Sequence, residues 1–298
     1  MNSNTADGAT APVYPHAADL AALLPALETL VDEIVTTGLS REMLARALDT
    51  GMTEVTSVLH AVPSAEGKLL ERGIALIAGR NPDLVVLTQN LRLPVTRAAS
   101  ELVEMNDPSL YRSLSLDADS GGRKSYTPDL LILNRRTEVA HLVDVKRSLG
   151  SYELARIVEL KNRMLAAALV VPDLLYKEHR RLHAKEVRVV ILNAENQRAD
   201  VDGGVWPLSH LDHLLEVTGA GEAMAHLREL FQHRVEENWS AALASRRQVA
   251  SVANVRGKAR KSPTLHCDGD DVCGTDARGR ARLPVSIGFA RAPRAAGP

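Results

Sequence analysis

The sequence has little of several features that mark particular protein classes. Only 3% of its 298 residues are aromatic, which argues against a surface on which bases of a single strand stack. Its two cysteines, Cys267 and Cys273, provide no disulfide framework, so a cytoplasmic location is expected. No apolar run is long enough to span a membrane, and residues 1–15 lack the basic start and apolar stretch of a signal peptide.

An excess of one charge is also missing. The chain has 36 Lys and Arg against 37 Asp and Glu, so it has no general attraction for nucleic acid. Contact with nucleic acid would have to come from a local basic patch. The hydrophobic content of 45% and the charged content of 24% are ordinary for a globular protein of one or two domains. Function is therefore expected to reside in local motifs.

The most informative stretch covers residues 127–147. It holds two short apolar runs, Leu130–Leu133 and Val139–Val145, separated by the polar residues 134–137. Short apolar runs joined by a polar turn are typical of a β-hairpin. The pattern predicts two neighbouring strands.

Charged residues lie at one end of this predicted hairpin. Because side chains alternate along a strand, Asp144 and Lys146 are expected on the same face, and Asp129 opens the neighbouring strand. Two carboxylates can hold a divalent cation, which polarises a phosphate and lowers the pKa of a bound water. An ammonium can stabilise the negative charge that develops during hydrolysis. The three residues are thus suited to metal-assisted phosphodiester hydrolysis.

Pro128-Asp129, followed after fourteen residues by Asp144-Val145-Lys146, resembles the motif of the PD-(D/E)xK nuclease superfamily. The resemblance rests on these few residues and not on the whole chain. It implies that Asp129, Asp144 and the backbone carbonyl of Val145 bind magnesium or manganese. It also implies that Lys146 assists the attacking water.

In this superfamily the helix that leads into the core often supplies a further carboxylate to the metal. The corresponding helix here begins near Ser64 and offers Glu66 and Glu71. Because they are five residues apart on a helix, only one of them is expected to face the site. Glu71 is favoured because it adjoins the apolar stripe of the helix, although both could simply be solvated charges.

The order of predicted elements gives the fold class. The leading helix is followed by a strand or bent pair at 84–95, the hairpin, a helix over Tyr152–Val170 and a buried strand over Glu186–Asn193. This order matches the αβββαβ, restriction-endonuclease-like core that the resemblance implies for an α/β protein.

Residues 17–62 show the spacing of an N-terminal helical bundle. A first helix ends at Gly38, and two shorter helices are expected over Arg41–Leu48 and Glu54–Ala61. They could form a helix-turn-helix, but a bundle packed on the main domain is favoured. The predicted division is a flexible tail (1–16), the helical bundle (17–62), the nuclease-like core with C-terminal helices (63–248) and a disordered basic tail (249–298).

Basic residues near the motif are candidates for contact with the phosphate backbone of DNA. They lie in the loop before Asp129 and in or near the helix that follows the hairpin: Arg123, Lys124, Arg147, Arg156 and Lys161.

Two other metal sites are less well supported. His266, Cys267 and Cys273 match no zinc module. His179 and His183 are four residues apart on a helical piece predicted over 176–184, but Arg180 stands where a zinc protease needs glutamate.

The sequence therefore predicts a magnesium-dependent nuclease acting on DNA. If the substrate is double-stranded, a homodimer is expected, because double-strand cutting by this fold usually needs two active sites. Two alternatives remain: a nucleic-acid-binding protein of the same fold that does not cut, and a protein-interaction module in which the charges form structural ion pairs.

Overall fold

A computed structural model describes residues 14–50, 52–88, 91–111, 114–119, 124–179, 182–195 and 198–258. The chain divides into two compact units, residues 1–253 and residues 254–298. The description below concerns the first unit and the last helix, which continues to Lys258. In the described residues no helix is both long and apolar enough to cross a membrane.

A central mixed sheet organises the first unit. Its strands are β2 (Leu84–Leu87), β5 (Leu130–Asn134), β6 (Val139–Lys146), β7 (Glu186–Asn193) and β8 (Val205–Pro207), in the spatial order β2-β5-β6-β7-β8. The pairs β2–β5 and β5–β6 are antiparallel, whereas β6–β7 and β7–β8 are parallel. The hairpin predicted from the two apolar runs is confirmed as β5 and β6.

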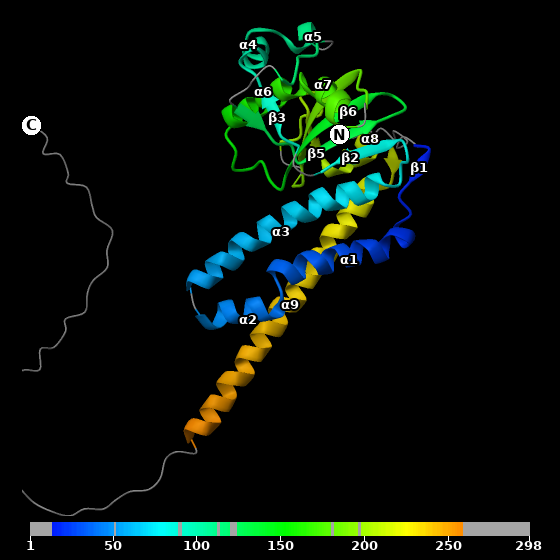
Figure 1. The fold of residues 1–298 in the computed structure, drawn as a ribbon. Helices are drawn as coiled ribbons and strands as arrows, with labels where there is room; N and C mark the ends of the chain where they lie inside the picture. The colour runs from blue at the N-terminus through cyan, green and yellow to red at the C-terminus, as the bar shows by residue number, and fades with distance from the viewer. Residues whose placement is uncertain are drawn as a thin grey trace, which may run out of the picture. The chain divides into compact units, whose positions relative to one another are not determined.

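Helices cover both faces of the sheet (Figure 1). One face of the sheet packs against α1 (Leu20–Gly38), α3 (Met52–Ala78) and α9 (Ala220–Lys258), through residues that include Leu130, Ile132 and Val143.

The other face packs against α4 (Arg97–Met105), α6 (Leu154–Ala168) and α7 (Val171–Glu178), through residues that include Leu131, Leu133 and Leu142. Because both faces are buried, these strands are continuously apolar instead of alternating with polar residues. The result is a mixed α/β protein in three layers.

A second, two-stranded sheet lies outside the central one. Strand β3 (Leu93–Val95) pairs antiparallel with β4 (Lys124–Tyr126), and Leu93 lies opposite Tyr126. The segment between the two strands contains α4 and the short helix α5 (Pro108–Tyr111). Of the bent pair predicted over 84–95, only β2 joins the central sheet, while β3 leaves it to pair with β4.

The N-terminal helices differ from the prediction in one respect. The helix expected over 54–61 and the helix expected from Ser64 are a single helix, α3, which continues through Pro63. Proline removes one backbone hydrogen bond from a helix, but Pro63 is exposed, so water can satisfy the carbonyl left free. Helix α2 (Arg41–Thr50) packs on α3, and α1 and α3 share their core with the sheet. This agrees with a bundle packed on the main domain; the helix-turn-helix remains a prediction.

Some residues of both predicted tails belong to secondary structure. Near the N-terminus, β1 (His16–Ala17) pairs with β9 (Val217–Thr218), and the Tyr14 N–H donates to Thr218 Oγ1 at 2.9 Å. At the other end, residues 249–258 belong to α9. Residues 1–13 and 259–298, with His266, Cys267 and Cys273, lie outside the described residues.

The helical piece predicted over 176–184 is present only in part, because residues 176–178 form the end of α7. Helix α7 ends at Glu178, and residues 182–185 are not helical, so His179 and His183 do not share a helix face. After β8, a 3-10 turn (Leu208–His210) and α8 (Leu211–Leu215) lead to β9 and α9.

Candidate active site

The register of β5 and β6 brings the two motif aspartates together. Leu130 lies opposite Val143, so Asp129, one residue earlier, is beside Asp144. The Asp129 carboxylate is held in place because its Oδ2 accepts a 2.6 Å hydrogen bond from the Val145 N–H. Within a strand, the N–H and C=O of one residue point to the same side. The Val145 carbonyl therefore also points towards the side of Asp129.

Lys146 joins the two carboxylates. Its Nζ makes an ion pair with Asp144 Oδ1 and lies 3.9 Å from Asp129 Oδ2. The Lys146 side chain is 25% exposed, whereas that of Asp144 is only 7% exposed. Burial lowers the pKa of Lys146, but the two neighbouring carboxylates outweigh burial and leave its pKa raised. Lys146 is thus a cation at neutral pH, in a site open to solvent on one side.

Tyr126 is a member of this cluster that the sequence reasoning missed. Its hydroxyl donates a 2.7 Å hydrogen bond to Asp144 Oδ2, and the residue is 6% exposed. Burial, followed by the charge of Asp144, raises the pKa of the Tyr126 hydroxyl far above its usual range, so the hydroxyl remains a donor. No local sequence pattern near Tyr126 indicates a role in the site. Its contact with Asp144 depends on how β4, a strand outside the central sheet, packs, and local patterns do not predict that packing.

The two glutamates on α3 have different surroundings. Burial, then the charges of Asp129 and Asp144, raises the pKa of Glu71 to about 7, while Lys146 and Lys68 oppose this shift. Glu71 therefore lies within the electrostatic reach of the motif residues, half-buried and without a salt bridge among those found in the described residues.

Glu66 is held by a different element. Its Oε1 accepts hydrogen bonds of 2.8 and 3.2 Å from Arg228 on α9, and Arg228 also donates to the Ala194 carbonyl at 3.0 Å. Glu66 is nearly buried, at 9% exposure, with its charge already neutralised. Of the two candidates, Glu71 is the one whose charge interacts with the motif.

The cluster offers few ligands for a divalent cation. Within the described part of the chain, no three His, Cys, Asp or Glu side chains are arranged as ligands to one ion. Magnesium, however, is commonly held by one or two carboxylates, with water and substrate phosphate completing its shell. Asp129, Asp144 and the Val145 carbonyl fit that smaller requirement.

The electrostatics of the cluster also suit a cation. The pKa of Asp129 is raised by burial and by Asp144, against the effects of the Val145 hydrogen bond and Lys146. Asp129 and Asp144 thus share the ammonium of Lys146, and Glu71 lies within electrostatic reach of them. The repulsion among these carboxylates would be relieved by a bound cation. The buried Asp144 Oδ1 has Lys146 as its ion-pair partner and makes no further hydrogen bond within the described residues.

The basic residues predicted to contact DNA differ in whether their charges are exposed or already paired within the protein. Lys124 is exposed on β4, and Arg156 is exposed on α6 with its guanidinium 5.7 Å from the centre of the Tyr152 ring. Arg147 is paired with Glu195 at 3.3 Å. Arg123 lies outside the described residues. Lys124 and Arg156 are therefore the most accessible of these candidates in the described chain.

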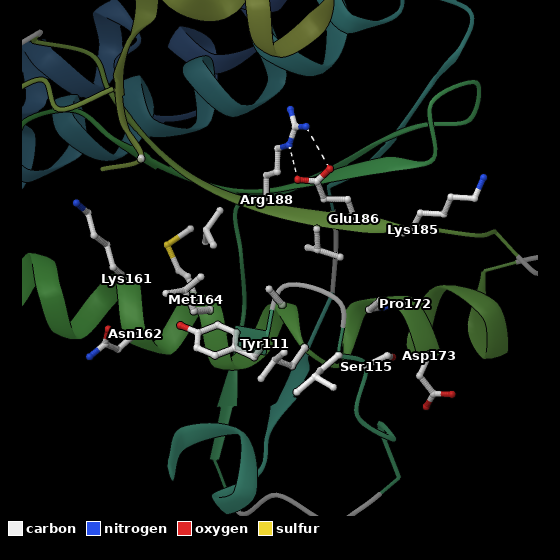
Figure 2. Close-up of a pocket in the computed structure, with 18 of the residues that line it drawn as sticks. Tyr111, Ser115, Lys161, Asn162, Met164, Pro172, Asp173, Lys185, Glu186 and Arg188 are labelled. Carbon is white, nitrogen blue, oxygen red and sulfur yellow. Dashed lines mark hydrogen bonds and ion pairs between the residues drawn. The ribbon is translucent and has the colours of Figure 1, made fainter. Parts of the chain in front are cut away.

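Lys161 belongs to a separate cavity of about 910 Å³ between α6, α7 and β7 (Figure 2). The cavity lies against the N-terminal half of β7, whereas the motif residues lie at the carboxyl end of β6, and none of them lines it. Lys161 also pairs with Asp200 at 3.5 Å. Glu186 and Arg188 are paired with each other on the strand and point away from the two helices (Figure 2).

No family model, curated protein or solved structure matches this chain. What the protein does is therefore inferred from its own residues and their geometry.

Proposed function

We propose that the protein is a metal-dependent nuclease of the PD-(D/E)xK, restriction-endonuclease-like type, which hydrolyses phosphodiester bonds of DNA. The supporting observation is the meeting of Asp129, Asp144 and Lys146 at the carboxyl end of β6. The order α3, β2, β5, β6, α6, β7 agrees with the core expected from the motif.

Asp129, Asp144 and the Val145 carbonyl would hold magnesium or manganese, which would polarise the scissile phosphate and acidify a water molecule. Lys146 carries the positive charge of the site and stabilises the charge that develops on the phosphate oxygens. Glu71 would supply the further carboxylate that the resemblance implies for the metal, since its charge lies within electrostatic reach of Asp129 and Asp144. Lys124 and Arg156 offer charges for the DNA backbone.

A purely structural role for the charges fits less well. A structural network would be expected to balance buried charges, because unpaired ones are costly. Here the carboxylates outnumber the ammonium, and the half-buried Glu71 lies within electrostatic reach of Asp129 and Asp144. This excess of negative charge favours a cation-binding site over an interaction module.

Cleavage of supercoiled plasmid and of a linear single strand, with magnesium, manganese or EDTA, tests the proposal. The wild type is expected to cut only with a metal, and Asp144→Asn to lose at least about 100-fold in rate because it removes a charged ligand. Asp83→Asn is the matched control, since Asp83 pairs with Arg136 on the surface. Equal rates for wild type and Asp144→Asn would refute the assignment. A folded wild type that binds DNA in a salt-dependent manner without cutting would support the non-cleaving alternative.

A further inference from the structure

The Asp144 carboxylate is held from two sides by two different elements. Tyr126 on β4 donates to Oδ2, and Lys146 on β6 pairs with Oδ1. Asp144 is 5% exposed, so rotation of the carboxylate would remove a buried oxygen from its donor. The carboxylate is therefore fixed in one orientation.

Tyr126 reaches this carboxylate from outside the central sheet. Among the described residues, strand β4 pairs only with β3, and the Tyr126 ring is buried in the core on the α6 side, with Leu93 and Val95 of β3. The two-stranded sheet thus delivers a donor to a residue 18 positions further along the chain. A tyrosine that served only to pack would not need its hydroxyl at 2.7 Å from a motif aspartate.

We propose that Tyr126 is a positioning residue that fixes Asp144 Oδ2. It thereby sets the orientation in which Oδ1, the oxygen beside Lys146, would serve the metal site. This inference rests on the proposed nuclease function. Groups that hydrogen-bond to metal ligands orient them, and their loss commonly weakens metal affinity about 10- to 100-fold. In this role Tyr126 touches neither substrate nor metal and acts only through Asp144.

The test is isothermal titration calorimetry of the full chain with Mn²⁺, which compares the Mn²⁺ affinity of wild type with that of Tyr126→Phe. The variant removes only the hydroxyl and keeps the buried ring. We expect about a tenfold weaker Mn²⁺ affinity. Cleavage by the variant should need correspondingly more metal yet return to within about threefold of the wild-type rate at saturating Mn²⁺, because a positioning role acts on ligand geometry.

Tyr111→Phe is the matched control. Tyr111 is a second buried tyrosine, 4% exposed, in the same core cluster, and it lines the separate cavity. This control should bind Mn²⁺ like the wild type. Thermal unfolding in EDTA shows whether each variant is folded.

The outcomes separate this inference from the proposed function. Unchanged Mn²⁺ affinity of Tyr126→Phe, beside a wild type that binds metal and cuts DNA, would overturn the role of Tyr126 and leave the nuclease in place. An unfolded Tyr126→Phe would also overturn it, since the hydroxyl would then be structural. A folded wild type that neither binds Mn²⁺ nor cuts would overturn both.

Discussion

Among single residues, His141 should make stability depend on pH. It lies on β6 and is 9% exposed; burial, then Arg188, lowers its pKa to about 4, against the opposing effect of Glu186. The unfolded chain, with a histidine pKa of about 6.5, therefore binds the proton more readily than the folded protein between pH 6.5 and 4. Stability is present above this window and is lost as the pH falls through it.

We predict a loss of about 2 kcal/mol in the free energy of unfolding between pH 7 and pH 5 from this residue. Urea unfolding at the two pH values measures it. The difference should shrink in His141→Gln and persist in His233→Gln, which replaces a mostly exposed histidine on α9. An equal pH response of wild type and His141→Gln would contradict the prediction.

The two glutamates of α3 should respond in opposite ways to the same substitution. Glu66→Gln removes the counter-charge of Arg228 and is expected to destabilise the protein by about 2 kcal/mol. Glu71→Gln removes a carboxylate repelled by Asp129 and Asp144, so at pH 8 in EDTA it should be neutral or stabilising. It should nevertheless slow cleavage at least about tenfold, because it removes a carboxylate from the proposed metal site. Urea unfolding measures the effects on stability, and plasmid cleavage measures the effects on rate. If Glu66→Gln slowed cleavage and Glu71→Gln destabilised the protein, Glu66 would be the site residue.

At the scale of elements, the packing of α3 against α9 depends on a glycine. A Cβ on Gly73 would lie 2.4 Å from Leu227 Cδ2 and 3.0 Å from Met224 Cε, both on α9. Gly73→Ala is therefore expected to cost about 1–3 kcal/mol through overpacking, despite the better helix propensity of alanine.

Gly67 on the same helix provides the control. A Cβ there would meet nothing within 4 Å, so Gly67→Ala should stabilise by about 0.5–1 kcal/mol. Thermal unfolding distinguishes the two variants. Stabilisation by Gly73→Ala would contradict the prediction and show that the ends of the Leu227 and Met224 side chains move aside at little cost.

Local sequence patterns predicted some elements and not others. The apolar runs that became β5, β6 and β7 carry their own signal, because buried strands are continuously apolar. The continuity of α3 through Pro63 could not be predicted, since the local cost of proline is offset by tertiary packing on both sides of it. The departure of β3 from the central sheet was missed for a related reason: its partner, β4, lies some thirty residues away.

The candidate site was predictable in the same uneven way. Asp129, Asp144 and Lys146 follow from strand alternation and a hairpin register. Tyr126 and the pairing of Glu66 with Arg228 depend on contacts between elements distant in sequence, which leave no local pattern.

At the scale of the whole molecule, charge sets how DNA could be bound. The net charge of the chain is −1, so no long-range field draws it towards a polyanion. Binding would depend on local groups such as Lys124 and Arg156 and would be sensitive to salt. In the proposed site one phosphate would lie close to Lys146, and catalysis would depend on that single ammonium.

The most direct measurement is the rate of magnesium-dependent DNA cleavage by Lys146→Met, relative to wild type. Lys185→Met is the matched control, because Lys185 forms an ion pair with Glu138 away from the motif. Loss of at least about 100-fold in Lys146→Met, with wild-type rates in Lys185→Met and normal folding of both, is the predicted result. Undiminished cleavage by a folded Lys146→Met would contradict the central claim that Asp129, Asp144 and Lys146 form a hydrolytic site.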